Sequence, residues 1–265
     1  MPNFPFDPVA TTYSPANAYA LAKMSQLSYG PSADIMAGCA TFGFNHFQFF
    51  GEEIPEPAAF LAASDTAIVA CFRGTADFQD IVSDIRIHLT GGPLAGKVHD
   101  GFLHDLSGFW LELLQAILDQ QSAARSLWFT GHSLGAALAT LAAARTLERG
   151  LLINGLYDYG SPRCGDGTFA TAFDAKFDQA YRFVYCQDVV TRAPPRLFGY
   201  RHVGEVKYID RNCQITGALG GWAEFLREVD YTMEELRQKQ LSAIGDHNIA
   251  NYIRCLGSQP GVPAA

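Results

Sequence analysis

The pentapeptide Gly131-His132-Ser133-Leu134-Gly135 lies at the junction of two apolar segments and sets narrow limits on the architecture. The short run Leu127-Trp128-Phe129 before it is typical of a buried strand, and the Ala-rich segment 134–147 after it is typical of a helix. G-x-S-x-G between a strand and a helix predicts a sharp turn that presents the serine at the edge of a sheet. Without this context, the pentapeptide would fit an ordinary Gly-Ser turn with no chemistry.

Strands and helices alternate along most of the chain. Apolar periodicity predicts helices at 16–29, 106–118, 134–147 and 167–177 and one from Ile249, and strands at 42–50, 60–63, 67–72, 127–129, 153–159 and 181–185. Ser64-Asp65 joins two of these strands in an expected hairpin. We therefore expect an α/β fold with a mostly parallel central sheet and helices on both faces, in a single domain over residues 1–265. Such sheets bind ligands just beyond the carboxyl ends of their strands.

The composition excludes several classes of protein. The 265 residues are 48% hydrophobic and 17% charged, so the chain can bury a sizeable core. The formal net charge is −8, and no cluster of Lys and Arg marks a nucleic-acid surface, so we expect no nucleic-acid partner. The sequence as given shows no signal peptide, which predicts a cytoplasmic protein or a mature secreted form. Residues 126–144 contain no Asp, Glu, Lys or Arg, but the turn at 130–133 argues against a transmembrane segment.

The cysteines give no sign of a metal site or of a disulfide framework, because they lie far apart and form no C-x-x-C pair. We expect buried free thiols at all six positions, Cys39, Cys71, Cys164, Cys186, Cys213 and Cys255. The sequence also lacks H-E-x-x-H, G-x-G-x-x-G and G-x-x-x-x-G-K-[ST]. We therefore expect no metal, dinucleotide or other cofactor.

A serine nucleophile needs a base to accept its proton and an acid to orient that base. In hydrolases with this strand-turn-helix motif, the acid and then the base follow the serine along the chain. Asp188 follows the strand at 181–185 and is expected at the sheet edge that holds Ser133. Asp178 precedes that strand and belongs to the opposite edge, and Asp210, after a later strand, is the weaker rival.

Two histidines follow the candidate acid. His247 lies in a loop that opens the last helix, from which a base can reach over the sheet edge. His202 begins an apparent strand, which places it at the opposite edge, so we favour His247 and keep His202 as the alternative. Either residue also fits a structural role. Three earlier histidines are expected to be structural or to support the site: His99, His104 and His132.

Acyl transfer also needs hydrogen-bond donors for an oxyanion. One donor is expected to be the backbone N–H of Leu134, directly after the serine. The second donor is expected in the turn Phe72-Arg73-Gly74-Thr75. There the backbone N–H of Thr75 is the candidate donor, and the Thr75 hydroxyl is a further candidate. Taken alone, this turn would be an ordinary hairpin exit with Arg73 in an ion pair.

Several linked motifs over residues 16–256 together resemble those of the class 3 lipases, the fungal-type triacylglycerol lipase family of the α/β-hydrolase fold. They are the strand and turn 68–75, Asp80 to Asp84 in place of D-W-x-x-D, Val98 to Phe102 for V-H-x-G-F, the pentapeptide 131–135, Tyr159 to Arg163 for F-G-x-P-R, Asp188 to Pro195 for the acid, and Asp246-His247 for the base. The resemblance implies the same five site residues as the reasoning above: the triad Ser133, Asp188 and His247 and the oxyanion donors Thr75 and Leu134. The sequence departs from the family at Thr191, Cys164 and Ile81, where proline, valine and tryptophan are usual.

The expected activity is hydrolysis of carboxylic esters of lipids through an acyl-enzyme, as in triacylglycerol lipases. Two alternatives remain: a carboxylesterase or feruloyl-type esterase acting on soluble esters, and a catalytically silent hydrolase fold used for binding. The expected partners are a small-molecule or lipid ester and, transiently, a lipid interface. Phe78 to Leu89 and Trp222 to Val229 have the apolar spacing of amphipathic helices and are candidate lids, although core-packed helices explain the same spacing.

Overall fold

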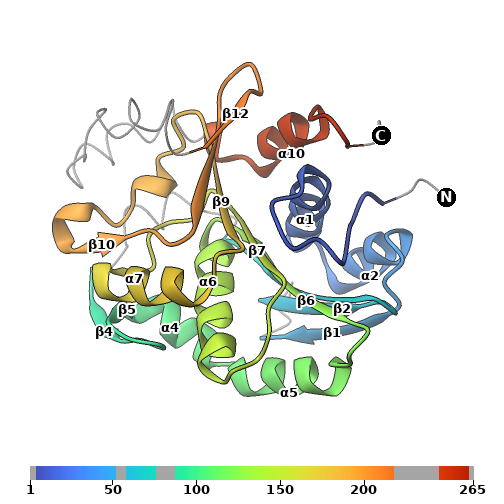
Figure 1. Cartoon of the computed structure of the whole chain (residues 1–265), viewed down its shortest axis with the longest axis horizontal. Helices are drawn as coiled ribbons and strands as arrows, with labels where there is room; N and C mark the ends of the chain where they lie inside the picture. Colours follow the sequence, from blue (N-terminus) through green and yellow to red (C-terminus); the bar gives the residue numbers. More distant parts are fainter. Residues whose placement is uncertain (1–3, 52–57, 76–86, 218–244, 263–265) are drawn as a thin grey trace.

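Figure 1 shows the computed structural model of the chain, which describes residues 4–51, 58–75, 87–217 and 245–262. Within these residues, the main sheet has the strand order β1-β2-β3-β6-β7-β9-β11-β12. Its strands are β1 (His46–Phe50), β2 (Ala59–Ala63), β3 (Ala67–Phe72), β6 (Ser126–His132), β7 (Gly155–Tyr159), β9 (Ala180–Tyr185), β11 (Glu205–Ile209) and β12 (Ile215–Thr216).

The five central strands, from β3 to β11, run parallel. The edges are antiparallel: β1 and β2 are added to β3 at one side, and β12 to β11 at the other. The predicted mostly parallel sheet and the predicted β2–β3 hairpin are therefore confirmed. In the register of β3 and β6, Phe72 lies opposite Gly131, so the turn that follows β3 begins beside the pentapeptide.

Helices cover both faces of this sheet, as the alternation of elements predicted (Figure 1). One face carries α1 (Pro15–Leu27), α2 (Ser32–Thr41) and α10 (Ile249–Gly257), and the other carries α4 (Asp100–Ser107), α5 (Trp110–Gln120), α6 (Leu134–Glu148) and α7 (Gly167–Lys176). The helix α6 is buried on most sides because its alanines let it pack tightly against the sheet and α4. It is thus a rigid support for the residue that precedes it, Ser133.

Several elements differ from the sequence prediction. The expected helix 106–118 is two helices, since the chain turns at Gly108 and Phe109 between α4 and α5. The expected strand from Phe42 begins only at His46, because α2 extends to Thr41. A small second sheet was not predicted and has the order β10-β8-β5-β4, with β4 (Leu89–Gly91), β5 (Lys97–His99), β8 (Gly165–Asp166) and β10 (Tyr200–Arg201). Its strands are too short to produce a periodic pattern.

Two further sequence expectations concern possible membrane contact. Residues 126–144 fold as β6 followed by α6, as expected, and none of the helices within the described part of the chain is long and apolar enough to cross a membrane. Both candidate lid segments lie outside the described residues, apart from residues 87–89 of the first one, which are not helical: residues 87 and 88 are irregular and Leu89 begins strand β4.

The expectation of free thiols is wrong for one pair of cysteines. Cys213, in the turn between β11 and β12, forms a disulfide with Cys255 of α10. The two positions are 42 residues apart, and only the packing of this turn against α10 brings them together. The other four cysteines are buried free thiols, as predicted: Cys39, Cys71, Cys164 and Cys186.

The disulfide is expected to stabilise the folded protein. Changing both Cys213 and Cys255 to Ser should lower the free energy of unfolding by about 2–4 kcal/mol, because the unfolded chain is then no longer cross-linked. Urea unfolding measured with and without a reductant checks this: the reductant should destabilise the wild type and leave the double variant unchanged. A double variant as stable as the oxidised wild type would contradict the prediction.

Candidate active site

Ser133 occupies the junction between β6 and α6 in a strained backbone conformation, with φ 61° and ψ −131°. Such a conformation costs a non-glycine residue about 1–3 kcal/mol. The Ser133 N–H donates to the carbonyl of Tyr159 at 3.0 Å, which ties the turn to the end of β7. Its side chain is fully buried, and within the described residues its Oγ has no hydrogen-bond partner. A strained serine at a strand-helix junction is typical of a nucleophile turn.

The glycines on either side of Ser133 are required by close backbone contacts. A Cβ at Gly131 would lie 2.3 Å from the carbonyl oxygen of Gly135. A Cβ at Gly135 would lie 2.2 Å from the carbonyl oxygen of Phe72, at the end of β3. No side chain fits at either position, so the G-x-S-x-G pattern follows from the packing of this turn against β3.

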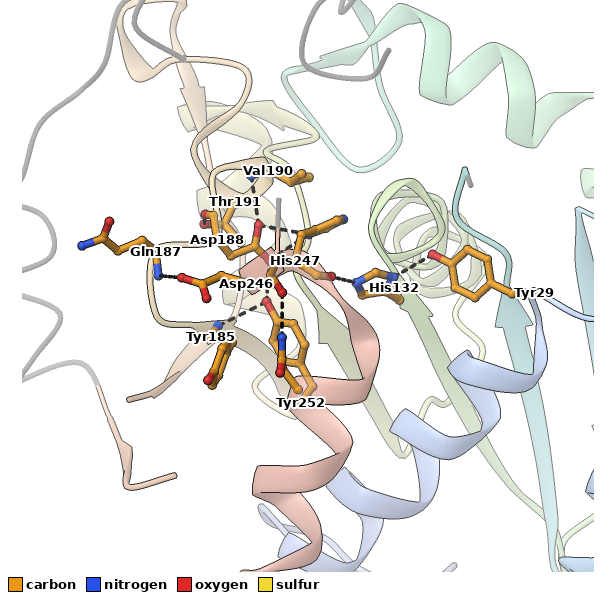
Figure 2. Close-up of polar contacts among 12 residues, drawn as sticks. Tyr29, His132, Tyr185, Gln187, Asp188, Val190, Thr191, Asp246, His247 and Tyr252 are labelled. Atoms are coloured by element: carbon orange, nitrogen blue, oxygen red, sulfur yellow. Dashed lines mark hydrogen bonds and ion pairs between the residues drawn. The ribbon is translucent and has the colours of Figure 1, made fainter. Parts of the chain in front are cut away.

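Asp188 and His247 form a buried hydrogen-bonded pair (Figure 2). Nδ1 of His247 lies 2.8 Å from Oδ2 and 3.0 Å from Oδ1 of Asp188. Since a carboxylate accepts hydrogen bonds, Nδ1 carries the proton and donates it, and Nε2 is the basic nitrogen of the neutral ring. Asp188 follows β9, and His247 ends the 3₁₀ helix η3 (Gly245–His247) before α10. The structure thus brings the predicted acid and base together.

Gly160 links this pair to Ser133. It has φ 60°, and a Cβ there would lie 2.8 Å from Asp188 Oδ2 and 2.9 Å from His247 Nδ1. Its preceding residue, Tyr159, accepts the hydrogen bond from the Ser133 N–H. The end of β7 therefore touches the serine turn on one side and the acid-base pair on the other.

Tyr252 of α10 supports the carboxylate. Its hydroxyl donates to Asp188 Oδ2 at 2.5 Å and accepts from the backbone N–H of Tyr185 at 3.2 Å. Burial, together with the negative charge of Asp188, raises the pKa of Tyr252 well above its ordinary value, so the hydroxyl stays protonated and can donate. In the sequence, Tyr252 stands three residues after Ile249, a spacing that indicates only the apolar face of a helix. Its role depends on a contact with a residue 64 positions away.

Changing Tyr252 to Phe should lower the free energy of unfolding by about 1.5–3 kcal/mol, the range for a hydrogen bond to a charged group. Tyr157→Phe is a matched control, because the Tyr157 hydroxyl is also buried but accepts a hydrogen bond from an uncharged donor, the backbone N–H of Ser14, at 3.1 Å. The control should lose about 1 kcal/mol. Urea unfolding of both variants checks the difference, and a Tyr252→Phe loss no larger than that of the control would contradict it.

The segment after Asp188 is held by side chains that the sequence pattern did not assign a role. The guanidinium of Arg163 donates to the carbonyls of Arg192 and Pro194, and Thr191 Oγ1 donates to the carbonyl of Asp188 at 2.8 Å. The residue that departs from the family pattern at position 191 thus stabilises the turn that carries the acid.

Thr75 and Leu134 lie where an oxyanion could be bound. A Cβ at Gly74 would lie 3.1 Å from the Cβ of Ser133, so the turn after β3 is packed against the serine. Thr75 and Leu134 line the same cavity of about 790 Å³, together with the apolar Phe109 and Leu138. Leu134 is the first residue of α6, where backbone N–H groups lack helical acceptors and the helix dipole favours negative charge.

The rival acid and base are engaged elsewhere. His202 Nε2 donates to the carbonyl of Thr191 at 2.8 Å, and desolvation with the nearby guanidinium groups of Arg182 and Arg163 holds the pKa of His202 well below its ordinary value. Asp210 Oδ1 accepts the N–H groups of Asn212 and Gln214, which closes the turn after β11.

Two of the earlier histidines, His99 and His104, have other positions in the fold. His99 caps α4 by accepting the N–H of Phe102 at 3.2 Å, and His104 lines the cavity beside Thr75. Over the described ranges, no cluster of three or more His, Cys, Asp or Glu side chains could hold a metal ion.

Comparison with known proteins gives consistent matches. The family model described as lipase (class 3) matches residues 69–198. A lipase of Rhizomucor miehei is 35% identical over 157 residues, which are 56% of this chain and 43% of that protein. A secreted mono- and diacylglycerol lipase of Fusarium solani is 36% identical over 159 residues, which are 56% of this chain and 46% of that protein. The chain spans less than half the length of these two relatives.

Among solved structures, the triacylglyceride lipase of Rhizomucor miehei is similar with a TM-score of 0.68 and 30% sequence identity, over 76% of this chain and 82% of that one. The lipase of Rhizopus microsporus var. chinensis is similar with a TM-score of 0.63 and 26% identity, over 78% of this chain and 82% of that one.

Proposed function

Because the chain belongs to the class 3 lipase family and has the α/β-hydrolase fold expected from its sequence, we propose that it is a serine hydrolase that cleaves carboxylic esters of lipids. The observation that carries the proposal is the buried Asp188–His247 hydrogen bond beside the strained turn of Ser133. The similar proteins of Rhizomucor miehei and Fusarium solani are lipases by name, which supports lipid esters as the substrate class.

In this proposal, the Ser133 Oγ attacks the carbonyl carbon of the ester while His247 Nε2 accepts the hydroxyl proton. Asp188 keeps the proton of His247 on Nδ1 and stabilises the imidazolium that forms. The N–H groups of Thr75 and Leu134 donate to the oxyanion of the tetrahedral intermediate. His247 then protonates the leaving alkoxide, and the acyl group remains on Ser133.

Water completes the cycle in the same geometry. It attacks the acyl carbonyl carbon while His247 Nε2 accepts one of its protons, and the second tetrahedral intermediate collapses with return of that proton to Ser133 Oγ. The carboxylic acid leaves and the free enzyme is restored. In this scheme His247 Nε2 accepts or donates each proton that is transferred, and the backbone N–H groups only donate hydrogen bonds.

The choice of lipid over soluble esters is supported by two features of the site. The cavity beside Thr75 and Leu134 has apolar walls from Phe109 and Leu138, which suit an acyl chain. Ser133 has no exposed surface, so an ester can reach it only after part of the protein moves. An enzyme that opens at an oil-water interface would meet its substrate in this way, through transient contact with lipid.

Hydrolysis of a triacylglycerol across its solubility limit tests this choice. We expect fatty acid release to rise steeply once tributyrin forms an emulsion, and emulsified long-chain triacylglycerol to be hydrolysed as well. Ser133→Ala protein sets the background for both substrates. Turnover of soluble p-nitrophenyl esters or feruloyl esters alone, with no release from emulsions, would instead support the carboxylesterase alternative.

We further propose that the protein is secreted and does not act in the cytoplasm. The Cys213–Cys255 disulfide supports this, because disulfides persist in oxidising compartments. Titration of free thiols in the denatured protein from its native source tests it. Four free thiols of six cysteines are expected, and six would contradict an oxidising compartment.

A further inference from the structure

His132, the residue before Ser133, makes two hydrogen bonds to distant parts of the chain (Figure 2). Its Nδ1 lies 2.6 Å from the hydroxyl of Tyr29, which follows α1, and its Nε2 lies 2.7 Å from the backbone carbonyl of His247. His132 is buried, and Tyr29 is half-buried. One side chain therefore connects the end of α1, the serine turn and the loop of the candidate base.

The partners fix where the proton of His132 resides. A carbonyl oxygen can only accept, so Nε2 carries the proton and donates it to His247. Nδ1 of the neutral ring then accepts, and the Tyr29 hydroxyl donates to it. Desolvation, followed by the effect of His247, holds the pKa of His132 well below its ordinary value, which agrees with a neutral ring. The donor and the acceptor of each hydrogen bond are therefore fixed: Tyr29 donates to His132, and His132 donates to His247.

The side chains of His132 and Tyr29 also lie close to the ring of His247 and to the oxyanion turn at Gly74. The rings of His132 and His247 lie with their centroids 4.5 Å apart at an interplanar angle of 31°. A Cβ at Gly74 would lie 2.2 Å from the Tyr29 hydroxyl oxygen and 2.5 Å from the His132 carbonyl oxygen. The oxyanion turn, the serine turn and the base loop thus all meet at this pair of residues.

His247 needs two points of support to hold Nε2 in place. Its ring is held at Nδ1 by Asp188, but a ring held only there can pivot about that bond when the loop moves. The hydrogen bond from His132 holds the backbone carbonyl of the same residue. A misplacement of about 1 Å in a reacting group can cost 10²-fold in rate, so the second support matters for the chemistry.

We propose that Tyr29 and His132 are positioning residues for ester hydrolysis: the Tyr29–His132 pair fixes the backbone of His247 relative to Ser133 and to the oxyanion turn. The inference rests on the proposed function, because it assigns these residues to the support of that reaction. Neither residue exchanges protons with the substrate, and neither is a catalytic residue.

Three substitutions separate the two hydrogen bonds. Tyr29→Phe removes only the hydroxyl that donates to Nδ1. His132→Asn keeps a polar group near the Nδ1 position, but its shorter side chain cannot reach the carbonyl of His247. His132→Gln places an amide N–H close to the position of Nε2, so it can restore that bond. Tyr157→Phe is the control, since it removes a buried tyrosine hydroxyl whose partner is Ser14, away from the base loop.

The readout is kcat and KM for p-nitrophenyl butyrate, with thermal melting to establish that each variant is folded. We expect kcat to fall on the order of 10-fold for Tyr29→Phe and 10–10²-fold for His132→Asn, with KM within twofold of wild type. His132→Gln should recover most of the loss, and the control should keep wild-type kcat. This pattern ties the loss to the bond with His247, because general destabilisation would not distinguish Asn from Gln.

Two results would overturn the inference: kcat within twofold of wild type for both Tyr29→Phe and His132→Asn, or equal losses for His132→Asn and His132→Gln. Tyr29→Phe alone decides the matter if a His132 variant does not fold, since it removes a single oxygen atom. Ser133→Ala, assayed in parallel, distinguishes a failure of the proposed serine mechanism from a failure of the positioning role. Retained turnover in that variant would refute the serine mechanism itself, whereas its loss beside unaffected Tyr29 and His132 variants would refute only the positioning role.

Discussion

Replacing Ser133 by Ala is expected to lower kcat for ester hydrolysis by about 10⁴-fold or more, because the variant has no nucleophile to form an acyl-enzyme. The melting temperature should stay the same or rise. The Ser133 Oγ is buried and has no hydrogen-bond partner within the described residues, so its removal eliminates a desolvated polar group without breaking a bond. Steady-state assays with p-nitrophenyl butyrate and thermal melts measure both effects.

Ser25→Ala is a control with the opposite expectation. The Ser25 hydroxyl is also buried, but it is hydrogen-bonded to Thr130 Oγ1 at 3.0 Å. This variant should lose about 1 kcal/mol of stability and keep its kcat. Comparison of kcat and stability between the two variants therefore distinguishes a functional hydroxyl from a structural one. Ser133→Ala protein that still turns over the ester at more than a hundredth of the wild-type rate would contradict the assignment.

Replacing Asp188 by Asn is expected to lower kcat by about 10⁴-fold while the protein remains folded. Asp188 accepts hydrogen bonds from His247 Nδ1, from the Tyr252 hydroxyl and from the N–H of Val190. An amide has only one oxygen to accept with, so its NH₂ group must face one of these donors. When the NH₂ group faces His247, Nδ1 must accept and the ring carries its proton on Nε2, so this nitrogen can no longer accept the proton of Ser133.

Asp210→Asn is the matched control for the acid, since Asp210 was the rival candidate and its carboxylate closes the turn after β11. It should keep wild-type kcat. Measurement of kcat and KM for both variants decides between the two acids. A loss of less than tenfold in Asp188→Asn, or a large loss in Asp210→Asn instead, would show that the acid was wrongly assigned.

The sequence predicted the parts of the fold that depend on local patterns. The hairpin of β2 and β3, the parallel strands and the helix α6 all have apolar periodicity or runs that are visible in a short window. Ser133 could be found because its motif is contiguous, and Asp188 could be found because the end of a recognisable strand placed it at the correct edge. Chain order and a loop position then favoured His247.

The rest depends on contacts between distant residues, which a single sequence does not show. The Cys213–Cys255 disulfide joins positions 42 residues apart, and the Tyr29–His132 hydrogen bond joins positions 103 residues apart. Tyr252 has the same apolar spacing whether its hydroxyl has a partner or not. The small second sheet has strands of two or three residues, which are shorter than any periodic signal. These contacts surround the candidate site, so the sequence alone pointed to the candidate reacting groups and to a supporting or structural role for His132, but not to the contacts that hold them in place.

The identity of the nucleophile is tested most directly by covalent labelling. A fluorophosphonate reacts with a serine only when a neighbouring base activates it, so incubation followed by peptide mass spectrometry reports the modified residue. We expect a single adduct, on Ser133, that forms in the wild type and is absent in Ser133→Ala. An unlabelled wild-type protein would instead indicate a catalytically silent fold, and an adduct on another residue would contradict the mechanism.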